Sequence, residues 1–472
     1  MCLGASGTQA DSASLLPRIQ KIVGEVSQDR IRATVARLVS FGTRNTLSSQ
    51  DDPERGIGAA RKWILQELQS YGPRLQVRYD HWRVKKQGQR IVKDIDLYNV
   101  IAVLPGKTNP EAQILVTAHY DSLNLGTPAG GTERDGNAGT ANGGLDSAPV
   151  AVGERPVQSD WETNIDLLAP GACDDASGVA AVMELARVMS QYEFEKTLVF
   201  IAFAGEEQGL VGSTLEAAKA KKENLAIEAV LNNDIVGTEV SGDGRTGNRA
   251  VAVYGDDVLD SPAQQLARYV HTVGQLYLPQ MSVNAIYMQD RLGRGGDHSP
   301  FQQEGYPAVR LSTPNEILAN QHHATDTLEN MSVPYTARVA CVNAAAAASL
   351  ALAPRTPDVM SQPRGGSGSG APTASRRLPM ISRGGGYDAV LRWRTAGSDA
   401  SLKGYAIVMR ATTSPFWERE IYVGKVNQFI LKGVSIDETR FGVKAIGVDG
   451  SESLVAAYAY PPRQKVEYQT VE

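Results

Sequence analysis

Apolar positions in the first part of the chain recur at the spacing of a helix. In "IRATVARLVSFG" (residues 31–42) and "GIGAARKWILQELQSYG" (residues 56–72), apolar side chains return every three or four positions, which is typical of amphipathic helices. Segments with the pattern of strands follow, namely "LQVRYDHWRV" (75–84), "LYNVIAVLPG" (97–106) and "QILVTAHYDS" (113–122). The pattern therefore predicts helices at the start of the chain and strands directly after them.

From residue 171 onward, helical patterns alternate with short β-rich runs. Helices are predicted over residues 177–191 and 263–275, and strands over residues 196–205, 226–237 and 306–312. This alternation favours an α/β domain with a mostly parallel central sheet flanked by helices. The apolar run "VACVNAAAAASLALA" (339–353) is too short to span a bilayer and contains Asn343, so we expect a packed helix and no membrane span.

Two stretches rich in glycine divide the chain. Residues 123–168 form a polar insertion with neither helical nor strand periodicity. Residues 355–377 are predicted to be a flexible Pro/Gly/Ser linker, which separates a first domain (1–354) from a β-rich region (378–466). The short strands of that region resemble a fibronectin type III-like β-sandwich, in which Trp393 would be the buried core tryptophan.

The composition is that of an ordinary globular protein, with 42% hydrophobic and 21% charged residues in a chain of 472. A chain of this length predicts two or three domains. The net charge of −5 gives no support to binding of nucleic acid or of an anionic membrane. The cysteines, Cys2, Cys173 and Cys341, predict neither a disulfide framework nor a Cys-x-x-Cys zinc site. No signal peptide is predicted from the first residues, and lipidation of Cys2 stays open.

Histidines and acids gather where the predicted strands end. In doubly wound sheets, functional residues lie just beyond the carboxyl ends of the strands. The residues at such positions are His119, Asp121, Asp174, Asp175, Glu206, Glu207, Asp234, His322, His323 and Asp326. Imidazole and carboxylate together are the ligands of catalytic zinc, and two divalent cations would neutralise so many carboxylates. The sequence therefore predicts a metal centre at this edge of the sheet.

Each of these residues also has a structural explanation when it is considered alone. The acids before residue 177 would cap the following helix, and the helix dipole would favour Glu206 and Glu207 in a solvated first turn. His119 alone is more simply a core histidine with satisfied hydrogen bonds, and residues 322–323 a loop pair. The coincidence of all of them at one edge of one sheet favours the joint interpretation.

Six motifs together resemble a known family of enzymes. They are "AHYDS", "GACDDASG", "AGEEQGL", "NNDIVG", "GGDHSPF" and "HHATDT". In order and spacing they resemble the co-catalytic zinc aminopeptidases of the bacterial leucyl aminopeptidase and aminopeptidase Y type, metallopeptidase family 28. The resemblance covers roughly residues 30 to 350. It implies the zinc-exopeptidase fold, two zinc ions per chain, and hydrolysis of the N-terminal residue of peptides or small proteins.

The resemblance also implies a role for each matching residue. The implied zinc ligands are His119 and Asp234 for one ion, Glu207 and His322 for the other, and Asp174 as the bridge between the ions. Glu206 would be the general base that takes a proton from a water shared by the ions. Asp121 would orient His119. The position of His322 four residues before Asp326 selects it over His323 as the ligand.

The chain departs from its relatives at the position that stabilises the oxyanion. Some relatives have a tyrosine close before the "DH" or the ligand histidine, whereas here no tyrosine lies nearer than Tyr287. Arg291 or Arg294 is the candidate substitute. The other departure is the insertion at 123–168, which is longer than the connection expected between the first two motifs and is predicted to shape or cover the substrate pocket.

Three other functions stay open at this stage. They are a single-zinc glutaminyl cyclase-like enzyme, a carboxypeptidase of the same clan, and a non-catalytic binding protein on a peptidase fold. The "ASG" at residues 176–178 favours the two-zinc enzyme, because the cyclase relatives lack it. The linker and the sandwich predict a secreted or envelope-side enzyme, in which the C-terminal domain would attach to a surface or a polymer.

Overall fold

The computed structural model describes residues 16–126, 163–290, 295–314, 316, 319–361, 377–397 and 400–460. The chain divides into two compact units. The larger unit comprises Ser14–Val258 and Pro262–Ala353, and the smaller consists mainly of Pro354–Glu472.

The larger unit is built on one sheet, ordered β1-β2-β4-β3-β5-β8-β6-β7. Its strands are β1 (Gln76–Val84), β2 (Ile95–Leu104), β3 (Asn109–His119), β4 (Lys196–Phe203), β5 (Ala226–Asn233), β6 (Ala250–Tyr254), β7 (Ser282–Ile286) and β8 (Ala308–Ser312). The central strands β4, β3, β5 and β8 are mutually parallel, whereas β1, β2 and β6 each form antiparallel pairs. The prediction of a mostly parallel sheet is confirmed.

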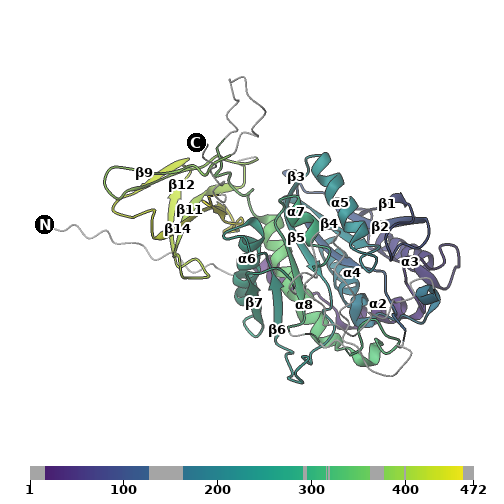
Figure 1. Cartoon of the computed structure of the whole chain (residues 1–472). Coiled ribbons are helices and arrows are strands. Elements are labelled where there is room, and N and C mark those ends of the chain that lie inside the picture. The colour runs from purple at the N-terminus through teal and green to yellow at the C-terminus, as the bar shows by residue number, and fades with distance from the viewer. Residues whose placement is uncertain are drawn as a thin grey trace, which may run out of the picture. The chain divides into compact units, whose positions relative to one another are not determined.

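Helices cover both faces of this sheet (Figure 1). They are α1 (Pro17–Gly24), α2 (Gln28–Ser40), α3 (Gly56–Ser70), α4 (Ser177–Met189), α5 (Val211–Lys222), α6 (Pro262–Tyr277), α7 (Ser299–Gln303) and α8 (Val333–Leu352). Ala217 and Ala220 of α5 and Phe301 of α7 pack on Leu115 and Ile201 of the central strands. Because side chains alternate across a strand, the opposite face is left for α4 and α8, which contact β3, β4 and β5.

Helix α8 contains the apolar run that was expected to be a packed helix. By length and composition alone it is long and apolar enough to cross a membrane, but most of it is buried inside the protein. It contacts α1, α4 and α6 as well as the sheet. The structure therefore confirms the prediction of a core helix.

Some elements have no counterpart in the sequence prediction, among them α5, β6 and β7. The buried positions of α5 are small or polar, namely Gly212, Ser213, Glu216, Ala217 and Ala220. A helix of this kind has no apolar stripe for a periodicity argument to detect. Strands β6 and β7 have only five residues each, which is too short for alternation to stand out.

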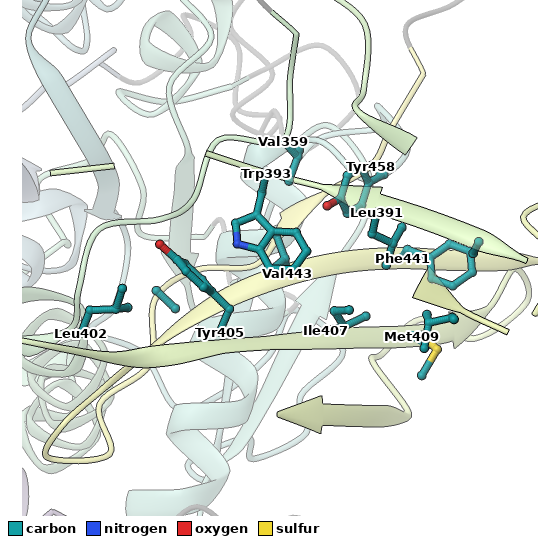
Figure 2. Packing of buried hydrophobic residues seen from close by; sticks show 13 residues of the cluster. Val359, Leu391, Trp393, Leu402, Tyr405, Ile407, Met409, Phe441, Val443 and Tyr458 are labelled. Atoms are coloured by element: carbon teal, nitrogen blue, oxygen red, sulfur yellow. The ribbon is translucent and has the colours of Figure 1, made fainter. Parts of the chain in front are cut away.

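The smaller unit contains two antiparallel sheets, ordered β13-β10-β9 and β12-β11-β14-β15. Its strands are β9 (Ile381–Arg383), β10 (Ala389–Arg392), β11 (Leu402–Ala411), β12 (Arg419–Gly424), β13 (Gln428–Leu431), β14 (Thr439–Gly447) and β15 (Ala456–Ala457). Figure 2 shows Leu391, Ile407 and Val443 converging on one apolar core. Trp393 is buried there and meets Tyr405 edge to face, with ring centroids 5.6 Å apart.

The structure corrects the start of the predicted linker at 355–377. Val359 is buried in the core of the smaller unit, and the backbone of Asp358 pairs with Arg394. Residues 355–361 therefore begin the β-rich unit, because the apolar side chain of Val359 packs into its core. The rest of the linker, residues 362–376, lies outside the described residues, as do residues 127–162 of the predicted insertion.

Candidate metal centre

Three parallel strands end at one edge of the large sheet, and each delivers acids or a histidine there. His119 is the last residue of β3, Asp234 follows β5 directly, and Glu206 and Glu207 follow shortly after β4. Gly205, which precedes the glutamates, has a φ of 78°. A glycine adopts this left-handed conformation without the strain that a side chain would bring, so the chain turns sharply as it leaves the strand.

Two segments outside the sheet complete the site. Asp174 lies in the segment Ala172–Ala176, which leads into α4, and His322 lies in the loop between β8 and α8. The carbonyl oxygen of His322 accepts a hydrogen bond from the backbone N–H of Leu125 at 3.0 Å. The first residues of the predicted insertion thus help to hold the loop that carries His322.

Asp174 lies between two groups of potential metal ligands. Its Oδ1 is 3.2 Å from His119 Nε2, and its Oδ2 is 3.2 Å from His322 Nε2. His119 Nε2 is 3.9 Å from Asp234 Oδ1, and His322 Nε2 is 3.1 Å from Glu207 Oε2. The ligand atoms within each group of three lie within 4.8 Å of one another. One carboxylate therefore presents one oxygen to each group.

The adjacent glutamates have different surroundings. Glu207 is buried and faces His322, whereas Glu206 is partly exposed. A carboxylate oxygen of Glu206 also lies within 4.8 Å of ligand atoms of His119 and Glu207. Glu207 therefore belongs to the donor group of Asp174 and His322. Glu206 is more exposed and lies near His119 of one group and Glu207 of the other.

Asp121 holds the turn that carries these glutamates. Its carboxylate accepts hydrogen bonds from the backbone N–H groups of Glu206 and Glu207 at 3.3 and 3.2 Å and from the Thr46 hydroxyl at 3.0 Å. His119 Nδ1 lies 3.2 Å from the Asp121 carbonyl oxygen and 3.6 Å from its carboxylate. Asp121, which was expected to orient His119, thus has both its carbonyl oxygen and its carboxylate near the imidazole.

Asp174 is itself held by neighbouring side chains. The Asp326 carboxylate accepts hydrogen bonds from the backbone N–H groups of Cys173 and Asp174 at 2.8 and 3.0 Å. Gln321 Nε2 donates to Asp174 Oδ2 at 2.9 Å. Among the described residues, Asp326 and His323 belong to neither donor group. Asp326 instead fixes the backbone that aims Asp174.

Arg310, on β8, was not singled out in the sequence. It is fully buried, with Nε 3.0 Å from Asp234 Oδ2 and Nη2 donating to the Asp234 carbonyl oxygen at 3.1 Å. Its Nη1 binds the Asp290 carboxylate at 3.1 and 3.2 Å. Arg310 therefore engages one oxygen of Asp234 while the other faces His119. The sequence feature that could have identified Arg310 is a charged residue within an apolar run that predicts a buried strand.

The crowding of acids shifts the pKa of several groups. Partial removal from water, together with the charges of Glu207 and Asp234, raises the pKa of Glu206 well above its usual range. Burial opposes the charged form of His322, but Glu207 and Asp174 outweigh it and raise the pKa of the imidazole to about 10. Protons on the histidines thus offset part of the negative charge, which is the electrostatic task that divalent cations perform in such sites.

The donor set fits zinc. Imidazole nitrogens and carboxylate oxygens are its usual ligands, and three protein ligands with an open position are typical of catalytic zinc sites. Each of the two groups supplies three residues, and Asp174 belongs to both. The oxygens of Asp174 face different groups, so the carboxylate is placed to bridge two cations. Of the predicted oxyanion groups, Arg291 and Arg294 lie outside the described residues.

The sequence family agrees with this geometry. Residues 99–347 match the model of peptidase family M28, and this span contains every residue of both donor groups. The chain belongs to peptidase family M28. It is 36% identical to a probable zinc metalloprotease of Pyricularia oryzae, over 92% of this chain and 83% of that protein. A probable zinc metalloprotease of Pyrenophora tritici-repentis is 32% identical, over 92% of this chain and 96% of the relative.

Solved structures support the fold of this M28 chain. Crystal structures of LapA and LapB from Legionella pneumophila each align with a TM-score of 0.50. LapA is 17% identical and the match covers 74% of this chain and 80% of LapA. LapB is 18% identical, with 72% and 76% covered. At this level of identity the likeness shows the fold alone.

Proposed function

We propose that this M28 chain is a two-zinc aminopeptidase that removes the N-terminal residue of peptides. The observation that carries the proposal is the position of Asp174, which offers one carboxylate oxygen to His119 and the other to His322. The names of the relatives, which are called probable zinc metalloproteases, support zinc as the metal. One zinc would be held by His119, Asp234 and Asp174, and the other by Glu207, His322 and Asp174.

The residues around the two positions fit hydrolysis of an amide. Bound zinc supplies Lewis-acid chemistry, which lowers the pKa of water and stabilises negative charge on oxygen. Glu206 takes the proton from the attacking water and returns it to the leaving amine. Its partial exposure and its raised pKa suit a group that alternates between carboxylate and carboxylic acid.

The acid-rich surroundings favour a substrate with a free α-amino group. The edge of the sheet brings together the carboxylates of Glu206, Glu207, Asp174 and Asp234. These oxygens can accept hydrogen bonds from the amino group of a substrate. A carboxypeptidase would need a cation for the substrate's terminal carboxylate. The buried guanidinium of Arg310 is already engaged by Asp234 and Asp290. The charge distribution therefore supports cleavage at the N-terminus.

Zinc analysis combined with hydrolysis of an aminoacyl p-nitroanilide tests this function. We expect two zinc ions per chain and activity that a chelator abolishes and zinc restores. Asp174→Asn should lower the occupancy of both zinc ions, whereas His323→Ala should leave two. One zinc per fully active chain would instead favour a single-zinc enzyme, and zinc without hydrolysis would favour a binding protein.

A further inference from the structure

The positively charged side chain of Arg44 is buried close to the metal centre. Arg44 lies shortly after α2 and is completely shielded from solvent. It precedes residues 99–347, the span that matches the M28 family model. Burial lowers the pKa of its guanidinium to about 10, and the carboxylates of Asp326 and Asp121 oppose this shift. The group therefore keeps its charge at neutral pH, and a buried charge is costly unless polar groups compensate.

This guanidinium joins two segments that carry different potential metal ligands. Its Nε donates to the carbonyl oxygen of Tyr120 at 2.7 Å, and Tyr120 follows His119 directly. Its Nη1 and Nη2 donate to the carbonyl oxygens of Pro170 at 2.6 Å and of Gly171 at 2.9 Å. These two residues begin the segment that leads to Asp174. One side chain thus connects the end of β3 with the backbone of the bridging residue.

The other contacts of Arg44 fix the guanidinium in this position. Nη1 also donates to the carbonyl oxygen of Leu38, in the last turn of α2, at 3.1 Å. The backbone N–H of Arg44 donates to Ser122 Oγ at 3.0 Å, and its carbonyl oxygen accepts from the Ser122 N–H at 3.3 Å. A Cβ at residue 171 would lie 2.8 Å from Nη2. The close approach of the guanidinium therefore requires a glycine there.

Arg44 and Asp326 hold the segment before Asp174 through opposite backbone groups. The guanidinium binds the carbonyl oxygens of residues 170 and 171, whereas the Asp326 carboxylate accepts from the N–H groups of Cys173 and Asp174. The carbonyl oxygen of Asp326 also accepts from the N–H of Ala172 at 3.0 Å. Hydrogen bonds of this kind are strong because one partner in each is charged. Each residue from 170 to 174 is therefore held by a hydrogen bond to one of these two residues.

We propose that Arg44 is a positioning residue of the metal centre and sets the separation between His119 and the bridging Asp174. The inference rests on the proposed two-zinc function and deepens it. The Nε bond fixes the backbone next to His119, and the Nη bonds fix the backbone that leads to Asp174. A guanidinium is planar and rigid, so these bonds hold the two segments at one distance. The ligands are thus placed for zinc before the metal binds.

The test measures zinc affinity of the full chain and its variants by competition with a chromophoric chelator. Arg44→Met keeps an apolar stem but has no donor, and we expect about 100-fold weaker zinc binding. Arg44→Lys keeps the charge, but its compact ammonium cannot span both segments, so affinity should fall about tenfold. The control is Arg187→Lys in the last turn of α4, where the guanidinium binds Glu184. Its zinc affinity should stay within about twofold of the original.

Denaturation of each metal-free variant separates positioning from a purely structural role. A structural role alone would lower the free energy of unfolding but leave the zinc affinity of the folded chain unchanged. That result with Arg44→Lys would overturn the proposal, even where Arg44→Met fails to fold. An equal loss of affinity in Arg187→Lys would overturn it as well.

Hydrolysis of an aminoacyl p-nitroanilide distinguishes this proposal from the function on which it rests. If the original chain binds zinc but does not hydrolyse the anilide, the aminopeptidase function fails. The comparison of zinc affinities still decides the role of Arg44 in that case, because it does not depend on turnover.

Discussion

The edge of the large sheet and the core of the C-terminal β-rich unit bury opposite kinds of side chain. At the sheet edge, His119, Asp121 and Asp234 are almost completely shielded from solvent. In the smaller unit the corresponding interior positions hold Trp393, Leu391, Val443 and similar apolar residues (Figure 2). Both regions exclude water, but only the second gains stability from the side chains that it buries.

The difference identifies where the chemistry lies. Burying several carboxylates together costs free energy unless cations or hydrogen bonds compensate. The large unit bears that cost at one edge of its sheet, with Asp121, Asp326 and Arg310 holding the groups in place. In the smaller unit, the buried cation Lys444 simply pairs with Glu420 and Glu452.

Glu206→Gln should reduce kcat by about 10²- to 10⁴-fold, because the amide is isosteric but cannot accept the proton of the attacking water. Fold and zinc content should stay the same, which metal analysis and circular dichroism would check. If the variant loses zinc, Glu206 is a ligand and the assigned role is wrong. If kcat stays near normal, the general base is another group.

Zinc binding should release protons from the metal centre. The pKa of His322 is raised from 6.5 to about 10 in the metal-free protein, so the imidazole is protonated at neutral pH and must lose its proton to bind zinc. Zinc affinity should therefore rise as pH increases from 6 to 8, by about tenfold per pH unit for each proton released. Calorimetry in buffers of different ionisation enthalpy measures this release, and an affinity independent of pH would contradict it.

Arg310→Met should weaken zinc binding and lower kcat/KM by about 10- to 100-fold, the range expected when a residue that orients a ligand is lost. The guanidinium holds Asp234 Oδ2 and so aims the other oxygen at the metal position. Arg310→Lys keeps the charge and should recover part of the affinity. Arg245→Met, at an exposed position, is the control. Unchanged zinc affinity in folded Arg310→Met would show that the ion pair is only structural.

Trp393→Ala should leave hydrolysis of a small aminoacyl anilide within about twofold of the original, although loss of a buried tryptophan costs about 3–5 kcal/mol of stability in the smaller unit. Each unit has its own apolar core, so we expect a separate low-temperature unfolding transition in calorimetry. Tyr387→Ala, at an exposed position of the same unit, is the control. A parallel loss of zinc or activity would place the β-rich unit in the catalytic machinery.

The sequence was sufficient for the identity of the large fold and for the residues that gather at its edge. Long apolar runs such as residues 196–205 predicted strands because burial on both faces leaves no polar positions. His119, Glu207 and Asp234 were among the candidates because the ends of parallel strands meet at one edge. The resemblance to zinc aminopeptidases then divided the candidates, Asp174 and His322 included, into expected ligands and other residues. The same reasoning could not find α5, whose buried positions are small or polar.

The arrangement of these side chains within the site follows from contacts that the folded structure alone reveals. One oxygen of Asp174 faces His119 and the other faces His322. This orientation depends on the Asp326 carboxylate, which lies about 150 residues further along the chain and binds the Asp174 backbone. In the sequence, Arg310 is one charged residue within a predicted strand. Its contact with Asp234 is visible only in the folded chain. Periodicity and spacing act along the chain, whereas the direction of a carboxylate or a hydroxyl is set by contacts between distant segments.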